Sequence, residues 1–271
     1  MDRYVVIGNP VAHSLSPAIH ARFARAMGDS LEYRTLMAPL DDFAAMARRF
    51  FDEGGRGANV TLPFKTNALR FAHEASDAAC LAGAANFLAC EGHRIRADNT
   101  DGIGLVTDLS ANLGIALHGK RILMLGAGGA ARGVIAPLLV HEPAAMVIAN
   151  RTLERAQDLA RQFSRLGDVS AAPLDATPGA PFDIVINATS SSVHGEALEL
   201  PAGSVEAGTL VYDMAYGRSA AGFLERARKR GASTSDGLGM LVEQAAESYR
   251  LWRGKRPATA AVIAELRSRA S

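Results

Sequence analysis

A glycine-rich turn between an expected buried strand and an expected helix constrains the fold more than any other feature. The run Gly126-Ala127-Gly128-Gly129-Ala130-Ala131 follows the apolar segment 121–125 and precedes a helical pattern over 132–139. The first glycine allows a tight turn, the second lets the backbone approach a pyrophosphate, and Ala131 allows close packing of helix on strand. Free N–H groups at the helix N-terminus favour phosphate. We expect this turn to bind a dinucleotide; the alternative is a tight turn without a ligand.

The segments after this turn continue the alternation of strands and helices. Short apolar runs at 146–149, 183–187 and 210–212 are typical of buried parallel strands, and a further helical pattern covers 153–163. Alternation of this kind predicts an α/β chain. We interpret the middle of the sequence as a Rossmann-like, doubly wound nucleotide-binding domain.

The beginning of the chain predicts a separate α/β unit. Strands are expected at 4–7, 31–37 and 58–62, together with a hairpin that pairs 86–89 with 94–97. Helices are expected at 17–27, 41–52 and about 101–113, and two more near the end of the sequence, at 240–252 and 258–269. Ser16 is the expected N-cap of the first of these helices, and Pro17 its first helical residue.

The residues after the strand 146–149 indicate which dinucleotide binds. An NAD site usually has Asp or Glu at this place to bind the ribose 2′-hydroxyl. Here the strand is followed by Asn150, Arg151 and Thr152, with Arg155 one turn later and no carboxylate at the strand end. The planar guanidinium of Arg151 suits a 2′-phosphate, and the other two residues add neutral hydrogen bonds. The sequence therefore favours NADP(H) over NAD, the alternative being a solvated helix start capped by Thr152.

Composition excludes several classes of protein. The 271 residues carry a net charge of only +1 and 6% aromatic residues, which argues against nucleic acid as a partner. Cys80 and Cys90 form neither a disulfide framework nor a zinc motif, and no metal site is expected. No signal peptide or membrane-spanning run is apparent, so we expect a cytoplasmic protein without membrane contact.

Two segments carry candidate acid–base chemistry. Lys65 follows the strand 58–62 and Pro63, where an amine can donate or accept a proton, although a surface lysine is the common alternative. Asp101 begins a helical pattern and can pair with Lys65 and accept a hydrogen bond from a substrate hydroxyl. Its alternative role is a helix N-cap.

Other polar residues are placed to hold a small substrate. Ser14 and Ser16 point the same way if their segment is extended, so both can donate to a carboxylate; a turn followed by a helix cap is the alternative. Asn86 begins a strand, and Gln244 lies one turn into a late helix; both can face the same site.

Taken together, these motifs resemble the shikimate dehydrogenase family over nearly the whole chain. The shared stretches are Gly8-Asn9-Pro10 with His13-Ser14-Leu15-Ser16-Pro17, then 57–65, 82–86, 98–102, 126–130, 150–152, 187–190, 212–214 and 236–240.

The resemblance implies an NADP-dependent oxidoreductase that reduces 3-dehydroshikimate to shikimate for aromatic amino acid biosynthesis. It implies a substrate-binding domain of residues 1–103, onto which 238–271 pack, and a dinucleotide-binding domain of 104–237. Lys65 and Asp101 would be catalytic. The substrate contacts implied are Ser14, Ser16, Thr61, Asn86, Asp101, Tyr216 and Gln244. The cofactor contacts implied are Gly126, Ala127, Gly128, Gly129, Ala130, Asn150, Arg151, Thr152, Arg155, Thr189, Met214, Gly237 and Met240.

Three points stay open in the sequence. Ser192 stands where many members of the family have glycine, which makes the local loop conformation uncertain. The alternative functions are a quinate/shikimate dehydrogenase of broader specificity and a non-catalytic NADP-binding regulator on the same scaffold. The oligomeric state is expected to be monomer or homodimer.

Overall fold

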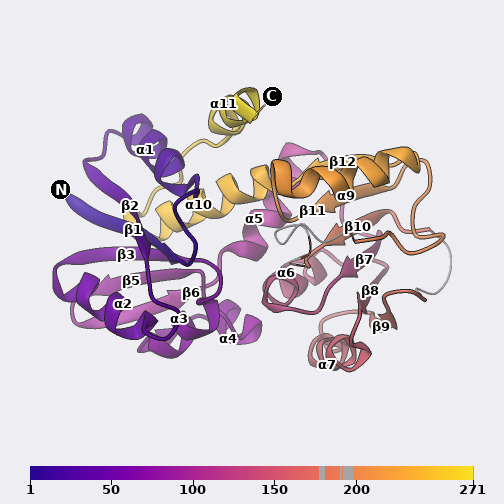
Figure 1. Cartoon of the computed structure of the whole chain (residues 1–271), viewed down its shortest axis with the longest axis horizontal. Helices are drawn as coiled ribbons and strands as arrows, with labels where there is room; N and C mark the ends of the chain where they lie inside the picture. Colours follow the sequence, from indigo (N-terminus) through magenta and orange to yellow (C-terminus); the bar gives the residue numbers. More distant parts are fainter. Residues whose placement is uncertain (177–180, 190, 192–197, 271) are drawn as a thin grey trace. The chain divides into compact units, whose positions relative to one another are not determined.

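A computed structural model describes residues 1–176, 181–189, 191 and 198–270. Ser192 therefore lies outside the described residues. The chain forms two compact units: Met1–Gly104 with Leu241–Arg269, and Leu105–Met240. Their elements are labelled in Figure 1. Within the described residues, no helix is both long enough and apolar enough to cross a membrane.

The first unit is built on a mixed six-stranded sheet in the order β2-β1-β3-β5-β6-β4. Strands β1, β2 and β3 are parallel, whereas β3, β5 and β6 are antiparallel neighbours. The expected hairpin is therefore present as β5 and β6. The strands are β1 (Asp2–Gly8), β2 (Leu31–Met37), β3 (Gly55–Val60), β4 (Glu74–Ala75), β5 (Phe87–Glu91) and β6 (Arg94–Asp98).

Helices cover both faces of this sheet because residues of β1 alternate between two hydrophobic clusters. Val5 and Ile7 pack with α2 residues such as Phe43, whereas Tyr4 and Val6 pack near Trp252 of α10. The helices are α1 (Ser16–Met27), α2 (Phe43–Asp52), α3 (Lys65–Phe71), α4 (Asp77–Ala82), α10 (Leu238–Arg253) and α11 (Ala260–Ala270). Helix α10, from the late part of the chain, therefore packs on the sheet that the first strands form.

His20 of α1 is buried without a hydrogen bond in the cluster around Trp252. Its exposed fraction is 1%, its ring stacks on Tyr33 at a centroid distance of 4.1 Å, and neither ring nitrogen has a hydrogen-bond partner among the described residues. Burial lowers the pKa of His20 to about 3, and the nearby Asn59 side chain opposes this shift weakly. The imidazole is therefore neutral at physiological pH.

We expect His20 to make stability fall in mild acid. Below the ordinary histidine pKa of about 6.5 the unfolded chain binds a proton that the folded chain does not, so stability present above this pH is lost as pH falls. The loss attributable to His20 is about 2 kcal/mol at pH 5. Urea unfolding at pH 7 and pH 5 should show a smaller acid loss in His20→Leu than in the wild type. The same substitution at exposed His141 should keep the wild-type loss; equal losses in all three proteins would contradict the prediction.

The second unit is a parallel six-stranded sheet in the order β12-β11-β10-β7-β8-β9. This order is that of the doubly wound dinucleotide-binding fold, and the direction of winding reverses between β7 and β10. The predicted α/β fold class with a Rossmann-like unit is confirmed. The strands are β7 (Arg121–Leu125), β8 (Ala145–Asn150), β9 (Val169–Pro173), β10 (Ile184–Asn187), β11 (Leu210–Asp213) and β12 (Ser233–Asp236).

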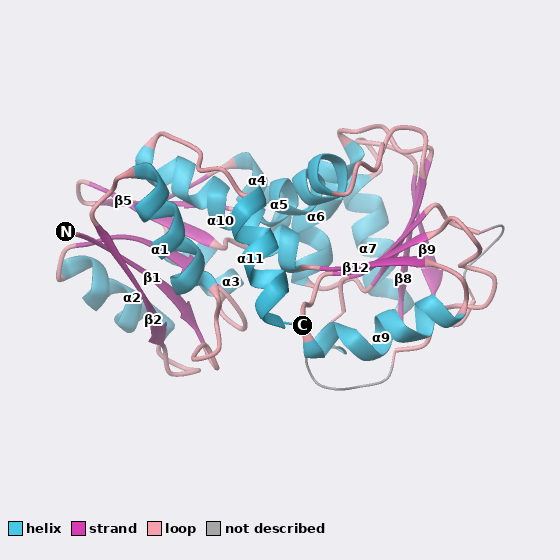
Figure 2. Cartoon of the chain, turned by 90° about the horizontal axis from the view of Figure 1, so that it is seen from above, coloured by secondary structure: helices cyan, strands magenta, loops and turns pink. Residues whose placement is uncertain are grey.

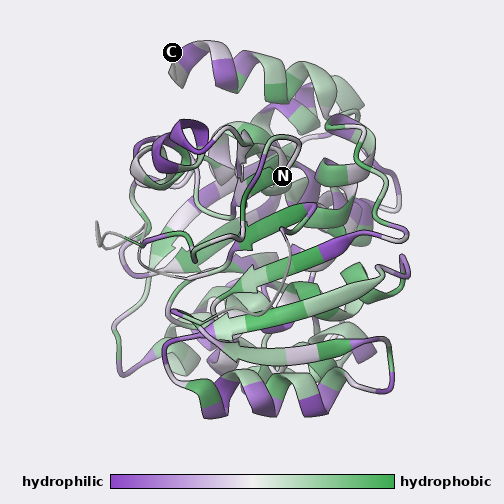
Figure 3. Cartoon of the chain, turned by 90° about the vertical axis from the view of Figure 1, so that its right-hand side faces the viewer, coloured by the Kyte–Doolittle hydropathy of each residue, from purple (hydrophilic) through white to green (hydrophobic). Residues whose placement is uncertain are grey.

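Both faces of this sheet are covered. Leu123 and Leu125 of β7 share a hydrophobic cluster with Phe223 of α9 (Arg218–Lys229), and the alternate residues of β7 face the opposite side. Figure 2 shows α9 and α6 (Gly129–Leu139) on opposite sides of the sheet. Figure 3 shows the strands mostly in the colour of hydrophobic residues. This double cover explains why β7 and β8 are continuous apolar runs rather than alternating ones.

One local expectation is wrong, and one is modified. Ser16 does not cap α1: it is the first helical residue, Leu15 holds the N-cap position, and the amide of Ser16 donates to Ser14 Oγ at 3.2 Å. The helix expected over about 101–113 is present, but its last turn is widened: α5 (Asp101–Thr107) continues directly into a π-helical turn over Asp108–Asn112. In this turn Asp108 accepts a hydrogen bond from Tyr212 Oη at 2.7 Å and is fully buried, a tertiary contact that the local pattern does not reveal.

Candidate active site

Lys65 and Asp101 form a close ion pair in the first unit. Lys65 begins α3, directly after the turn that follows β3, and Asp101 begins α5. Lys65 Nζ lies 2.5 Å from Asp101 Oδ2, and the side chains are 22% and 8% exposed. The ammonium group is thus fixed by a buried carboxylate yet remains partly accessible, an arrangement suited to handing a proton to a bound molecule. The two groups that the sequence singled out for acid–base work do meet.

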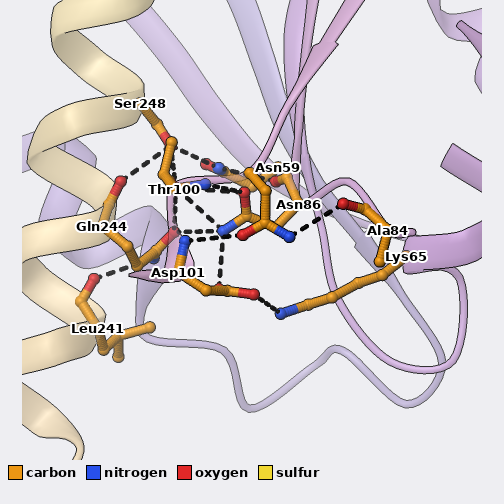
Figure 4. A network of polar contacts seen from close by, with 10 residues as sticks. Asn59, Lys65, Ala84, Asn86, Thr100, Asp101, Leu241, Gln244 and Ser248 are labelled. Carbon is orange, nitrogen blue, oxygen red and sulfur yellow. Dashed lines mark hydrogen bonds and ion pairs between the residues drawn. The ribbon is translucent and has the colours of Figure 1, made fainter. Parts of the chain in front are cut away.

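Asn86 holds the other oxygen of Asp101. The amide N–H of Thr100 donates to Asn86 Oδ1 at 2.8 Å, and a backbone N–H can only donate, so the orientation of the Asn86 amide is fixed. Its Nδ2 then donates to Asp101 Oδ1 at 2.8 Å. The two carboxylate oxygens therefore have separate partners, as Figure 4 shows, and Asp101 cannot rotate without breaking one contact. The alternative interpretation of Asp101 as a simple helix cap does not match these contacts.

Gln244 of α10 joins the same group of side chains. Its Oε1 lies 3.3 Å from both Asn86 Nδ2 and Thr100 Oγ1, and its Nε2 donates to the carbonyl of Leu241. The expectation that Gln244 faces the site from the late helix therefore agrees with its position. Four of the expected site residues in this unit come together: Lys65, Asp101, Asn86 and Gln244.

Four further substrate residues are expected: Ser14, Ser16, Thr61 and Tyr216. Ser14 and Ser16 do not stand in an extended segment, because the amide of Ser14 donates to the carbonyl of Val11 in a turn and Ser16 is already helical. Thr61 follows β3 and packs closely on Gly8. A Cβ added at Gly8 would lie 2.5 Å from Thr61 Cγ2. Tyr216 belongs to the second unit, after β11, where burial raises its pKa.

The glycine turn of the second unit has the geometry that a phosphate needs. Gly126 has φ +103°, a conformation that favours glycine, and a Cβ there would lie 3.0 Å from Thr189 Cγ2. Gly128 is the N-cap of α6, and a Cβ at Gly128 or Gly129 would meet no heavy atom of the described residues within 4 Å. The open space lies at a helix N-terminus, next to the strand pair where the sheet reverses its winding. These residues fit a dinucleotide pyrophosphate.

Asn150 connects this turn to the loop after β8. Its Oδ1 accepts from the amide of Ala127 at 3.2 Å, and its Nδ2 donates to the carbonyl of Thr152 at 2.8 Å. Arg151, Thr152 and Arg155 are exposed beside it. Thr152 occupies the N-cap position of α7 (Leu153–Phe163) but makes no side-chain cap hydrogen bond. Asn150 thus ties the glycine turn to the exposed segment that carries both arginines, and cations of this kind suit a 2′-phosphate.

The remaining expected cofactor residues follow β10, β11 and β12. Thr189 Oγ1 donates to Asn187 Oδ1 at 2.7 Å, and Asn187 in turn donates to Asp213. Gly237 is pressed against the loop after β11: a Cβ there would lie 2.3 Å from the carbonyl oxygen of Met214. Met240 is buried in α10. The carboxyl ends of β10, β11 and β12 thus gather these residues on one edge of the sheet.

Comparison with known proteins assigns the family. Residues 6–88 match the model of the shikimate dehydrogenase substrate binding domain, 108–218 that of shikimate / quinate 5-dehydrogenase, and 237–267 that of the shikimate 5'-dehydrogenase C-terminal domain. The shikimate dehydrogenase (NADP(+)) of Dechloromonas aromatica is 52% identical over 269 residues, which cover 99% of this chain and 98% of that protein. The chain belongs to the shikimate dehydrogenase family. The resemblance found in the sequence is thereby confirmed.

Solved structures of similar proteins agree with this family assignment. An Ael1 enzyme from Pseudomonas putida superposes with a TM-score of 0.92 at 46% identity, over 98% of both chains. The shikimate 5-dehydrogenase of Thermus thermophilus, solved in complex with NADP(H) and shikimate, gives a TM-score of 0.86 at 33% identity over 100% of both chains. As a member of this family, the chain has the two-part α/β architecture of these relatives throughout its length.

Three further buried residues support the site. The sequence places Asn59 with Thr61 on one strand face, as polar residues that can hold a ligand; Thr100 is identified only as part of a shared stretch, and Ser248 is not identified at all. Their side chains form hydrogen bonds with Asn86, Gln244 and one another. A signal for Ser248 was present: it lies four residues after Gln244 on α10, and therefore on the same helix face.

Proposed function

We propose that this chain is an NADP-dependent oxidoreductase that interconverts 3-dehydroshikimate and shikimate. The observation that carries the proposal is the Lys65–Asp101 pair at 2.5 Å, held by Asn86 within the unit that matches a substrate-binding family model. The names of the relatives, and the Thermus thermophilus complex with NADP(H) and shikimate, support the same substrate and cofactor. The first unit is proposed to bind the substrate, and the second the cofactor.

The proposed chemistry divides between the cofactor and two side chains. Bound NADPH supplies a hydride to the carbonyl carbon of the substrate ring. Lys65, as an ammonium, donates its proton to the carbonyl oxygen as negative charge develops there, and takes a proton back in the oxidation direction. Asp101 orients Lys65 through Oδ2 and accepts a hydrogen bond from the neighbouring ring hydroxyl. Because Asn86 already fixes Oδ1, this orientation is set before the substrate arrives.

The roles proposed for the other residues follow their chemistry. The hydroxyls of Ser14 and Ser16 donate to the substrate carboxylate, and amides and hydroxyls contact the ring hydroxyls. The residues proposed to contact the ring hydroxyls are Thr61, Asn86, Gln244 and Tyr216.

The cofactor contacts are proposed on the second unit. Amides of residues 126–130 bind the pyrophosphate at the N-terminus of α6, and Arg151 with Arg155 binds the 2′-phosphate. Asn150 holds the glycine turn against the following loop, and Thr152 starts α7 beside the arginines. Thr189, Met214, Gly237 and Met240 are proposed to line the nicotinamide side.

A cofactor and substrate assay tests the proposal. NADPH absorbance should fall rapidly with 3-dehydroshikimate, and NADH should be a poor replacement because no carboxylate stands at the end of β8 to bind a 2′-hydroxyl. In reverse, NADP⁺ should be reduced with shikimate far faster than with quinate. Comparable rates with quinate or NADH would instead support the broader quinate/shikimate activity. Tight NADPH binding without turnover of any substrate would refute the proposal and support the non-catalytic regulator. The cytoplasmic location and the monomeric or homodimeric state stay predictions.

A further inference from the structure

A chain of buried polar side chains runs behind the Lys65–Asp101 pair. Tyr33 Oη donates to Asn59 Oδ1 at 2.8 Å, and Asn59 Nδ2 donates to Ser248 Oγ at 2.8 Å and to the carbonyl of Asn86 at 3.2 Å. Since a carbonyl can only accept, the orientation of the Asn59 amide is fixed. Asn59 therefore does not point at a ligand: its hydrogen-bonding groups are engaged inside the protein.

Ser248 is the junction of this chain. Its side chain is fully buried, and its Oγ donates to the carbonyl of Gln244 at 3.0 Å. The one hydroxyl proton is thereby used, so Ser248 acts as an acceptor toward Asn59. Thr100 Oγ1 lies 3.4 Å from Ser248 Oγ, and the single Thr100 hydroxyl proton is shared among Ser248 Oγ, Gln244 Oε1 at 3.3 Å and Asn86 Oδ1 at 3.2 Å. Ser248 thus joins β3, α10 and the residue before Asp101 through a single oxygen, as Figure 4 shows.

Two short routes connect Ser248 to the proposed catalytic pair. Thr100 Oγ1 accepts from Asn86 Nδ2 at 3.0 Å, and the same Nδ2 donates to Asp101 Oδ1 at 2.8 Å. Gln244 is linked to Ser248 only through its main-chain carbonyl, one turn back on α10, and its side-chain Oε1 lies 3.3 Å from Asn86 Nδ2. Both routes end on the amide nitrogen that fixes Asp101, which in turn holds Lys65 Nζ at 2.5 Å.

We propose that Ser248 is a positioning residue for the reaction: its oxygen supports Thr100 and Asn59, and through them Asn86, whose side-chain amide orients Asp101 and Lys65. The inference rests on the proposed function. Without this oxygen, Asn59 Nδ2 loses an acceptor and the Thr100 hydroxyl loses one of its neighbours, so the Asn86 amide is less tightly held. Displacements of a reacting group by a fraction of an ångström to about 1 Å are enough to slow catalysis by about 10- to 100-fold.

Ser248→Ala tests the proposal, with Ser204→Ala as the matched control. Ser204 is equally buried at 1% exposure, and its Oγ donates to the carbonyl of Pro201, but it lies in the second unit outside the proposed site. We expect Ser248→Ala to lower kcat by about 10-fold while KM for NADPH stays unchanged. Ser204→Ala should lower Tm by a similar amount and leave kcat at the wild-type value. A normal kcat in Ser248→Ala, or an equal kcat loss in both variants, would overturn the proposal.

A second variant tests the same series of buried hydrogen bonds at its other end, Tyr33. Tyr33→Phe keeps the ring that stacks on His20 but removes the hydroxyl that holds Asn59 Oδ1. Its control is Tyr4→Phe, because Tyr4 pairs with Tyr33 across β1 and β2 while its hydroxyl interacts with Arg253. We expect Tyr33→Phe to lower kcat by about threefold, and the double variant with Ser248→Ala to lose less than the product of the single losses.

If the kcat losses of the two single variants multiply in the double variant, Tyr33 and Ser248 act independently. That result would overturn the proposal that the buried hydrogen bonds act as one unit. Wild-type turnover is measured first with the same substrate pair. Failure of the proposed function would therefore appear in the wild type, whereas failure of the positioning role would appear only in the variants.

Discussion

Lys65→Ala is expected to lower kcat by about 10²- to 10⁴-fold, the usual contribution of a positioned proton donor. The ammonium group is the cation that Asp101 holds at 2.5 Å, and its partial exposure leaves it accessible to a substrate. An interaction that strengthens only as charge develops on the carbonyl oxygen affects kcat much more than KM. Steady-state rates with NADPH and 3-dehydroshikimate measure both constants, and calorimetry of NADPH binding should show an unchanged affinity.

Lys120→Ala separates loss of this chemistry from loss of an ion pair. Lys120 Nζ also pairs with an aspartate, Asp183 Oδ1, at 2.8 Å, and holds the pKa of that carboxyl below its ordinary value. The pair is partly exposed and belongs to the second unit, whereas Lys65 and Asp101 belong to the first. Lys120→Ala should therefore cost at most about 1 kcal/mol of stability and leave kcat unchanged. Near-normal kcat in Lys65→Ala would refute the proposed role of Lys65.

Elements with strong periodicity could be predicted to the residue. The strands Leu31–Met37 and Arg121–Leu125 and the helix Leu153–Phe163 have the bounds that the sequence indicates. In the last two the apolar pattern and the tertiary burial agree, whereas in Leu31–Met37 only Tyr33 is buried and Met37 is exposed. The bounds of β3 differ from the prediction. The expected strand 58–62 instead spans Gly55–Val60: it begins earlier, in a segment with two glycines, and it ends before Pro63.

Weakly patterned elements were not predicted. Strand β12 has the sequence Ser-Thr-Ser-Asp, which carries no apolar signal and is a strand only because it pairs with β11 at the edge of the sheet. The seven-residue helix α3 follows a proline turn and is too short for a periodic pattern. Helix α9 is different: Ala220, Phe223, Leu224 and Ala227 are buried at helical spacing, so its signal was present but not used.

The site could be predicted only in part. Motifs identify Lys65, Asp101, Asn86 and Gln244, because each lies in a short recognisable segment or on a clear helix. The residues behind them are not marked by such motifs, and only the helical spacing from Gln244 points to Ser248. Asn59 and Ser248 are 189 positions apart, and their hydrogen bond exists only because α10 packs on the face of the sheet that carries Asn59. A contact of that kind leaves no local trace in the sequence.

Gly239→Ala is expected to be the most destabilising single-methyl addition in the second unit, costing more than about 3 kcal/mol. A Cβ at this position would lie 1.9 Å from Asp108 Oδ1 and 2.3 Å from its Cγ. The carboxylate cannot move aside easily, because it is fully buried and accepts from Tyr212 Oη at 2.7 Å and Asn112 Nδ2 at 2.9 Å. Relief of the clash would break a hydrogen bond to a buried charged group, or shift the start of α10. Denaturant unfolding of the variant measures the loss.

Gly222→Ala makes the same chemical change where space is available. Gly222 is exposed in the interior of α9, and the nearest neighbour of an added Cβ is Arg226 Nη1 at 3.7 Å. Alanine there should raise the free energy of unfolding by about 0.5–1 kcal/mol, because it is the better helix former. The cost of Gly239→Ala should also shrink in an Asp108→Ala background, since the added methyl group would then face a smaller side chain. A cost unchanged by Asp108→Ala would mean that the clash with this carboxylate is not the cause, whereas a reduced cost would assign to Asp108 the requirement for glycine at the start of α10.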